Sequence, residues 1–346
     1  MVQSVTRLSC AVPKSVRMVY SSIHRAAKEI RFRSYPSGQS ISMSFIRNQQ
    51  EKDIVQDIMS GNNVLIRGIK RIGKTSMLLA LRAKFPGSVI VSPCDQALDG
   101  FKWELADAIR GQTEIEVDWQ NNPIKEWVLK CDAPFLAIDE VTGLSEELCT
   151  YIAKIITENP KLRIALVIHH GKIDENKKFF PKLQQHYINA VSREEAKRLI
   201  LKPLEQYPEL KEFFSRYCLE EIQKCAGGIP YLIHGVCSEI LDILSEHASF
   251  DEALKAIKAL SYALSYGYNE KLMNRCAGML NISLASSEKD SLLALASGKS
   301  ISSKQAEPLI RIGVVRRKQG APGYEINGRL LENFIRSSLH DYRLKL

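Results

Sequence analysis

Gly68-Ile69-Lys70-Arg71-Ile72-Gly73-Lys74-Thr75 is the stretch that decides the fold, because it fits the pattern G-x-x-x-x-G-K-[ST]. The two glycines permit backbone angles and close approaches that a side chain would block, so consecutive N–H groups can turn inward around an anion. Lys74 supplies a mobile cation for the β and γ phosphates, Thr75 a hydroxyl for Mg²⁺, and Ser76 a hydroxyl for the α phosphate. Residues 68–76 are therefore predicted to bind ATP or GTP, with Lys74 also acting in catalysis.

The surroundings of this loop favour that interpretation over an ordinary glycine-containing turn. Residues 64–66 form a short apolar run that predicts a buried strand, and residues 75–84 predict a helix. Such a helix would point the positive end of its dipole, about half a charge, at the phosphates. Strand, loop and helix in this order are what the motif requires.

A second motif follows about 65 residues later, where the apolar run Phe135–Ile138 precedes Asp139 and Glu140. Strands of parallel sheets present their carboxyl ends to the ligand crevice, so Asp139 would reach Mg²⁺ through its water shell. Glu140 would polarise the water that attacks the γ phosphate. Alone, such a run often marks only a strand leaving the core, but its pairing with the loop favours the functional interpretation.

Two histidines end another predicted strand, over residues 164–168. His169 or His170 could sense the γ phosphate, and titration near neutral pH would then tune the response. The alternative is that the pair simply caps the end of the strand.

Apolar runs alternate with helical patterns up to about residue 190. One more strand is expected at 88–91, and helices are expected at 51–59, 100–109, 124–130 and 145–159. This alternation indicates βαβ units, and hence a P-loop NTPase domain of class α/β with a three-layer parallel sheet over residues 43–190.

Strand patterns almost vanish after residue 190. Ser192 with Glu195 forms a capping box, and further helices are expected at 218–225, 231–247 and 250–268. These residues, 191–285, are predicted to form a helical lid domain. Residues 286–346 then show the order helix, helix, two strands and helix, with a capping box at Ser302 and Gln305. That order is typical of a winged-helix domain.

Positive charge is concentrated at the two ends of the chain. Residues 1–42 hold seven Lys or Arg against one acid, residues 288–346 hold eleven against six, and the total is +9. Basic ends indicate either a polyanionic partner or a solvated surface. Residues 1–42 are treated as a basic segment, with a short amphipathic helix at 15–32 and a turn-rich linker at 35–43.

Composition excludes several classes of protein. The eight cysteines include no C-x-x-C pair, which disfavours a zinc site or a disulfide framework and favours buried, reduced thiols. No apolar stretch approaches the roughly 18 residues of a spanning helix, so we expect a soluble protein without a membrane partner. The family resemblance described next implies a cytoplasmic location. An organelle transit peptide in residues 1–30 is the alternative.

The chain resembles the AAA-like ATPases of prokaryotes, grouped with the STAND class of signal-transduction ATPases and the archaeal ATPase family. The resemblance is carried by residues 45–48, 64–76, 137–140, 191–196 and 227–232 and by the C-terminal helix and wing order. It implies that Pro230, in a Gly-x-Pro element, contacts the base or ribose. It also implies that lid and winged helix clamp ADP at rest, and that exchange for ATP opens them and promotes self-association.

The chain also departs from that family. Many relatives carry a Thr-Thr-Arg or similar sensor where this sequence has Ile168-His169-His170-Gly171, and no repeat array follows the winged helix. The effector would then be the basic segment 1–42 or a separate protein.

Three functional hypotheses follow. The first is an ATP-binding, slowly hydrolysing switch that uses ATP/ADP and Mg²⁺. The second is a DNA-binding AAA+ ATPase similar to replication-initiator or transposition ATPases, with Lys304 and Arg311 on a recognition helix and residues 316–318 on a basic wing. The third, a scaffold with purely structural nucleotide, is distinguished by whether a co-purifying nucleotide turns over.

Overall fold

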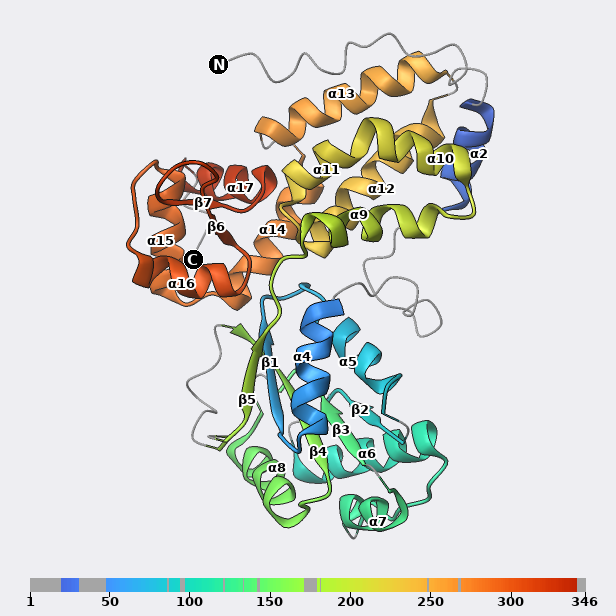
Figure 1. The fold of residues 1–346 in the computed structure, drawn as a ribbon, viewed down its shortest axis with the longest axis vertical. Coiled ribbons are helices and arrows are strands. Elements are labelled where there is room, and N and C mark those ends of the chain that lie inside the picture. The colour runs from blue at the N-terminus through green and yellow to red at the C-terminus, as the bar shows by residue number, and fades with distance from the viewer. Residues whose placement is uncertain are drawn as a thin grey trace.

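The computed structural model describes residues 20–30 and 48–340, except 86, 94–96, 121, 133, 142–143, 171–178, 181, 248 and 267–268. It shows a sheet-containing part below and two helix-rich parts above (Figure 1). The linker expected at 35–43 lies outside the described residues. Of residues 1–30, for which a transit peptide is the alternative, only residues 20–30 are described.

One parallel sheet of five strands has the order β2-β3-β4-β1-β5. The strands are β1 (Val64–Gly68), β2 (Val89–Val91), β3 (Phe135–Ile138), β4 (Arg163–His169) and β5 (Gln184–Tyr187). The four expected strands are confirmed. Strand β5 was not expected, because its sequence Gln-Gln-His-Tyr has no apolar pattern; it pairs with β1 at the edge of the sheet.

Helices cover both faces of this sheet. They are α4 (Asn48–Met59), α5 (Lys74–Arg82), α6 (Leu98–Thr113), α7 (Pro123–Lys130) and α8 (Glu146–Glu158). Side chains alternate along β3, so Phe135 and Ala137 join the core under α4 and α5, whereas Leu136 and Ile138 join the core under α6, α7 and α8. The predicted three-layer α/β architecture is therefore confirmed.

The helical region is formed by α9 to α14. Its helices are α9 (Arg193–Leu201), α10 (Pro208–Phe213), α11 (Leu219–Ala226), α12 (Pro230–Glu246), α13 (Phe250–Tyr266) and α14 (Glu270–Ser283), with a 3₁₀ turn at Lys202–Leu204 and a π turn at Phe214–Cys218. The capping box of Ser192 and Glu195 is present at the start of α9. Helices α10 and α14 were not expected.

Helix α2 (Tyr20–Glu29) is the described part of the basic N-terminal segment, and it packs against α10 and α12 (Figure 1). The Tyr20 hydroxyl donates to the His247 carbonyl at 2.9 Å, and His24 Nδ1 is 2.8 Å from the Leu244 carbonyl oxygen. Within the described residues, the basic amphipathic helix expected at 15–32 is present over 20–29, where it contributes to the helical region's core.

The C-terminal region follows the predicted order of elements. It consists of α15 (Ser286–Ala296), α16 (Ser303–Arg311), the antiparallel pair β6 (Val315–Arg317) and β7 (Tyr324–Ile326), and α17 (Arg329–His340). The capping box of Ser302 and Gln305 opens α16, as expected.

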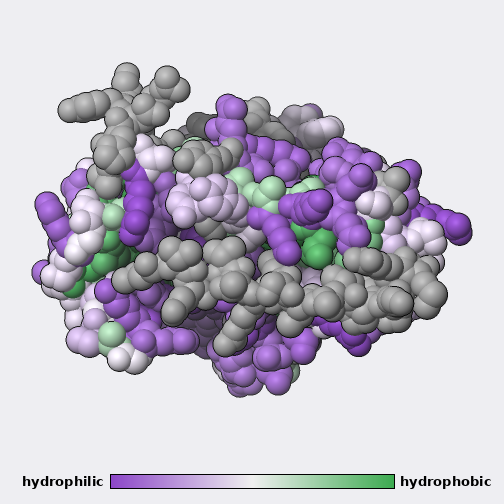
Figure 2. Space-filling model, turned by 90° about the horizontal axis from the view of Figure 1, so that it is seen from above, coloured by the Kyte–Doolittle hydropathy of each residue, from purple (hydrophilic) through white to green (hydrophobic). Residues whose placement is uncertain are grey.

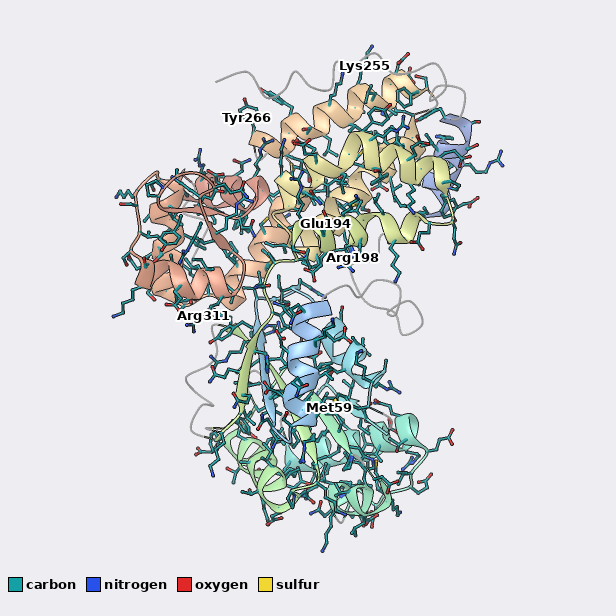
Figure 3. All side chains as sticks on the ribbon, in the orientation of Figure 1. Met59, Glu194, Arg198, Lys255, Tyr266 and Arg311 are labelled. Carbon is teal, nitrogen blue, oxygen red and sulfur yellow. The ribbon has the colours of Figure 1, made fainter. Side chains whose placement is uncertain are left out.

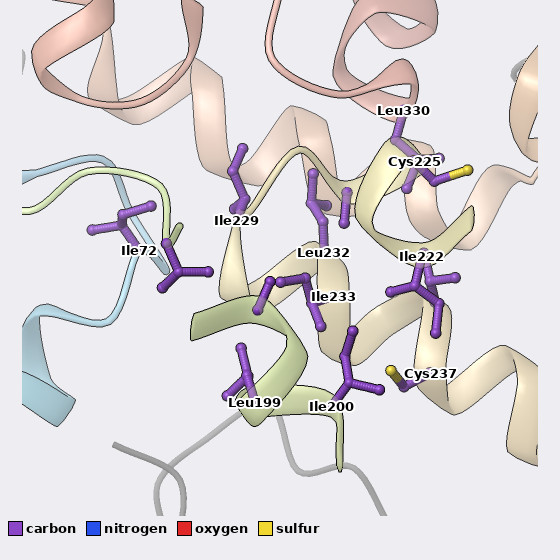
Figure 4. Close-up of a cluster of buried hydrophobic side chains, with 14 of the residues drawn as sticks. Ile72, Leu199, Ile200, Ile222, Cys225, Ile229, Leu232, Ile233, Cys237 and Leu330 are labelled. Carbon is purple, nitrogen blue, oxygen red and sulfur yellow. The ribbon is translucent and has the colours of Figure 1, made fainter. Parts of the chain in front are cut away.

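The loop after β1 packs against the helical region. Ile72 belongs to the same buried cluster as Leu199 and Ile229, and Figure 4 shows it beside them. The Val191 N–H also donates to the Gly228 carbonyl at 2.8 Å. The sheet and the helical region therefore share one continuous apolar core at the carboxyl ends of the strands.

Within the described parts of the chain, no helix is both long and apolar enough to cross a bilayer. The face seen from above is mostly hydrophilic, with hydrophobic side chains only in small patches (Figure 2). The six cysteines that the structure describes are free thiols, and five of them are buried.

Candidate nucleotide site

The loop between β1 and α5 has the backbone conformation that its glycines allow. Gly73, just before α5, has φ +104°, and Arg71 has φ +66°. At Gly68 the requirement is space, since a Cβ there would lie 2.8 Å from Ile72 Cγ2 and 2.9 Å from the Ile188 carbonyl oxygen. The chain folds tightly from β1 onto α5, so the helix begins at the carboxyl end of β1.

Lys74 is buried at the start of α5 and hydrogen-bonded on several sides. Its Nζ donates to the carbonyls of Gly68 at 3.2 Å and Ile69 at 3.0 Å, and lies 3.2 Å from His169 Nδ1. Burial lowers the pKa of Lys74 to about 8, although the charges of Asp139 and Glu140 oppose that shift. A buried ammonium with this low pKa is stabilised by any anion brought close to it.

Thr75 and Asp139, the two predicted Mg²⁺ ligands, lie together. The Thr75 hydroxyl donates to Asp139 Oδ2 at 2.6 Å, and the Glu140 N–H donates to Asp139 Oδ1 at 2.9 Å. Burial raises the pKa of Asp139, against these two hydrogen bonds. Two residues 64 positions apart in the sequence, one at the start of α5 and one directly after β3, are thus brought into contact at the carboxyl edge of the sheet.

Glu140 is exposed and has φ +54°, a left-handed conformation that is rare for a glutamate. The chain turns sharply here, since the Asp139 N–H donates to the Val91 carbonyl and the Val141 N–H to the Val167 carbonyl. Asp139 is therefore held inward while Glu140 is directed to solvent beside it. This arrangement suits the predicted roles, in which Glu140 holds a water molecule and Asp139 faces Mg²⁺.

The two histidines have different partners. His169 accepts from Lys74, whereas His170 Nε2 lies 2.7 Å from Glu288 Oε1 on α15, with both side chains largely buried. Burial, followed by the charge of Lys74, lowers the pKa of His169 to about 4, so this ring is neutral near pH 7. The idea that titration near neutrality tunes His169 is therefore wrong; the ring acts as a neutral acceptor.

The remaining predicted site residues surround the loop. Ser76 lies half-buried in the first turn of α5, and Lys70 and Arg71 are half-buried within the loop. Pro230 is the first residue of α12, and the next residue, Tyr231, has its ring 5.7 Å from Arg71 Cζ. The structure thus places Pro230 one residue from a side chain that meets the loop.

Arg67 and Tyr187, which lie near this edge, were missed by the sequence interpretation. Arg67 is 5% exposed, donates to the Tyr187 hydroxyl at 3.0 Å, and lies 5.7 Å from the Tyr187 ring centroid. Arg311 of α16 lies 5.6 Å from the same ring, and Figure 3 shows it on the side of α16 that faces the sheet. A charged residue inside a buried strand was the only available signal for Arg67.

These residues fit a magnesium nucleotide. Among the described residues no group of three or more His, Cys, Asp or Glu side chains could hold a metal ion by itself. Asp139 and Thr75 supply one carboxylate and one hydroxyl, which matches the usual way that Mg²⁺ binds with substrate phosphates as further ligands. Gly73, with φ +104°, gives the loop the left-handed backbone that a phosphate-binding turn uses.

Comparison with known proteins supports the fold. The structure is similar to a Walker-type ATPase of Pyrococcus abyssi over 84% of this chain and 96% of that one, with TM-score 0.50 and 15% identity. The chain has the fold of a P-loop ATPase. Lower TM-scores are found for a variant of RuvB from Thermotoga maritima, at 0.45, 13% identity and 87% and 95% coverage. A STAND protein with a tetratricopeptide repeat sensor from Pyrococcus horikoshii gives 0.35 and 16% identity, and this chain spans 42% of it.

No family model and no curated protein matches the sequence. The expected resemblance to prokaryotic AAA-like ATPases agrees with the likeness to the Walker-type ATPase. At this level of identity the likeness concerns the fold alone.

Proposed function

We propose that the chain is an ATP-binding, slowly hydrolysing switch in which nucleotide at residues 68–76 controls the placement of the C-terminal region. The observation that carries this proposal is the pair of consecutive histidines at the end of β4. His169 contacts Lys74, and His170 contacts Glu288 of α15. The residue that contacts Lys74 and the residue that contacts the C-terminal region are thus neighbours in the chain, so a change at the phosphate site can alter the contact with the C-terminal region.

The γ phosphate competes with His169 for Lys74. A phosphate oxygen offers the ammonium a charged acceptor, whereas the neutral His169 ring and two carbonyls offer dipoles only. When Lys74 turns to the phosphate, its contact with His169 is lost, and the set of contacts at the end of β4 changes. Differential contacts of this kind are what any ligand needs in order to shift an equilibrium between two conformations.

The hydrolytic step is assigned to Glu140, which orients the attacking water, with Lys74 holding the β and γ phosphates. Bound Mg²⁺, at Asp139 and Thr75, supplies neutralisation of phosphate charge. The left-handed backbone at Glu140 supports this role, because strained residues of this kind concentrate at functional sites. We propose Pro230 as the base or ribose contact, since it precedes the side chain that meets the loop.

The pair between His170 and Glu288 provides the test. Glu288→Gln removes the charge yet keeps an oxygen for the Ala285 N–H that Glu288 now caps, and His170→Ala removes the other partner. If ATP favours a conformation in which this pair is broken, each variant should raise the ratio of ATP to ADP affinity by about fivefold or more. The two effects should not add in the double variant.

Isothermal titration calorimetry with MgATP and MgADP measures these affinities. Glu212→Gln is the matched control, because Glu212 pairs with Arg216 on the exposed surface of α10, away from the sheet. An unchanged ATP to ADP ratio in both variants, with a wild type that binds, would rule out the switch through this contact. A wild type that binds neither nucleotide would rule out the proposed function itself.

DNA binding is the second candidate, and it is favoured by exposed cations in the C-terminal region. Lys304, Arg317 and Lys318 are exposed on α16, β6 and the turn after it. Arg311, however, is already engaged with Tyr187 and with Glu307. Fluorescence anisotropy with duplex DNA over a range of salt concentrations discriminates the two, since several phosphate contacts give a steep linear fall of log affinity with log salt.

A further inference from the structure

The ring of Tyr187, at the end of β5, is shared by side chains from the sheet and from the C-terminal region. Arg67 Cζ of β1 lies 5.7 Å from the ring centroid, and Arg311 Cζ of α16 lies 5.6 Å from it. Both distances are within the range of a cation–π contact. The ring of His170 has its centroid 6.2 Å from the same ring. One phenol therefore brings two guanidinium groups and an imidazole together between β5 and α16.

Arg67 is a buried cation that has no acidic partner. It is 5% exposed, and within the described ranges it makes no ion pair with an aspartate or a glutamate. Its Nη1 donates to the Tyr187 hydroxyl at 3.0 Å, whereas its Nε has no hydrogen-bond partner among the described residues. A phenol oxygen and a ring face offer the guanidinium no negative charge, so the cost of taking its charge out of water is not offset. An anion beside Arg67 would offset it.

The two acids that contact this cluster are engaged elsewhere. Glu288 Oε1 lies 2.7 Å from His170 Nε2, and its other carboxylate oxygen caps the start of α15. Glu307 pairs with Arg311 along α16, but both side chains are more than half exposed, so solvent screens this pair. His170 Nδ1 is buried and also has no hydrogen-bond partner in the described part of the chain. The charge of Arg67 is thus left without a carboxylate.

We infer that Arg67, Arg311 and the Tyr187 hydroxyl form a binding site for inorganic phosphate between β5 and α16. The side chain of Arg311 is 52% exposed, so an anion can reach it from solvent, and Figure 3 shows it on the side of α16 that faces the sheet. A guanidinium that lies with its face on a ring keeps its N–H edge for bidentate contact with phosphate oxygens. A small anion suits the place, because Arg67 is almost fully buried.

This site is separate from the proposed nucleotide site and does not depend on it. Strand β5 pairs with β1 on the side away from β4, whereas Asp139 follows β3 on the other side of β4. Phosphate bound to Arg67 and Arg311 joins a strand of the sheet to α16. It therefore stabilises the contact between the sheet and the C-terminal region, and acts as an effector of that contact.

Titration calorimetry with inorganic phosphate at constant ionic strength tests the site. The parent protein is Lys74→Ala, which removes the ammonium that would hold phosphate at residues 68–76. On this background, Arg67→Gln should lower phosphate affinity by at least about tenfold and Arg311→Gln by at least about threefold, because each removes charge-assisted hydrogen bonds. Arg216→Gln is the matched control, since it removes one exposed charge on the surface near α10 and should change affinity by less than about twofold.

Thermal unfolding supplies a second measurement. The midpoint of the parent protein should rise with phosphate and rise less with the same concentration of acetate, because a planar carboxylate has fewer oxygens for two guanidinium groups. Arg311 is half exposed, so Arg311→Gln tests the site even if the buried change Arg67→Gln prevents folding. Equal phosphate affinity in the parent and in the folded arginine variants refutes the site, as does a parent dissociation constant above about 10 mM. Equal stabilisation by acetate refutes the assignment to phosphate.

Discussion

Nucleotide affinity should fall with rising pH in a way set by Lys74. The pKa of this residue without nucleotide is about 8, because burial disfavours its charged form. Phosphate charge favours the ammonium, so the pKa in the complex is higher, and binding takes up a proton above pH 8. The affinity that depends on this group is therefore present below the ligand-free pKa of about 8, and it falls as the pH rises from about 8 towards the higher pKa of the complex.

The size of the effect follows from the fraction of Lys74 that is charged. With a pKa of about 8, roughly 76% is charged at pH 7.5 and roughly 9% at pH 9.0, so MgATP affinity should fall by about eightfold, or about 1.3 kcal/mol. Calorimetry in two buffers of different ionisation enthalpy should show proton uptake rising from about 0.2 to about 0.9 per ATP over this interval.

Lys74→Arg is the control for this titration. A guanidinium stays charged across the whole interval, so any affinity that the variant retains should vary little between pH 7.5 and 9.0. The reasoning is refuted if wild type shows a flat profile, or if both proteins lose affinity with the same slope, because other groups would then be responsible.

Four further substitutions have defined outcomes. Glu140→Gln should keep MgATP affinity within a few-fold while lowering turnover by about a hundredfold or more, measured by phosphate release; equal turnover would remove Glu140 from the mechanism. Asp139→Asn should abolish the gain in ATP affinity that Mg²⁺ provides but leave metal-free binding in place, which calorimetry with and without EDTA would reveal. Gly227→Ala should destabilise the fold by more than about 1 kcal/mol, because the residue has φ +60° and its Cβ would lie 2.2 Å from the Asn327 carbonyl oxygen. Ser192→Ala should cost about 1 kcal/mol through loss of the cap on α9, and urea unfolding with no change in midpoint would contradict the role of that cap.

The phosphate loop and the acid pair could be predicted because their chemistry demands particular residues at particular spacings. Two glycines, a lysine and a hydroxyl in one octapeptide predict a strand, a tight loop and a helix, and the structure has β1 and α5 on either side. An apolar run that ends in two acids predicts a strand end, and the Thr75 to Asp139 hydrogen bond shows that both motifs meet there. The local sequence was sufficient to predict both motifs, because each is defined by the types of a few neighbouring residues.

Strand β5 could not be predicted from its own residues. It has no apolar alternation, and its register depends on pairing with β1, where Val64 lies beside Gln184 and Arg67 beside Tyr187. That register brings the Tyr187 hydroxyl to a buried arginine, and neither residue had a recognisable motif. The contact between Arg275 of α14 and the Tyr231 ring could not be predicted either, because it depends on how α14 crosses α12.

The contacts of Arg311 decide how the two candidate functions relate. Its guanidinium lies 5.6 Å from the Tyr187 ring, and Tyr187 also accepts a hydrogen bond from Arg67 on β1, the strand that leads into the phosphate loop. The ring of Tyr187 takes one face of the Arg311 guanidinium, while the half-exposed side chain keeps its N–H edge for other partners. A duplex that binds the end of α16 would therefore compete with the sheet for Arg311, and it would bind more tightly if the C-terminal region left the sheet. Under the proposed switch the same separation follows from nucleotide exchange, so DNA affinity, if present, should depend on the nucleotide bound.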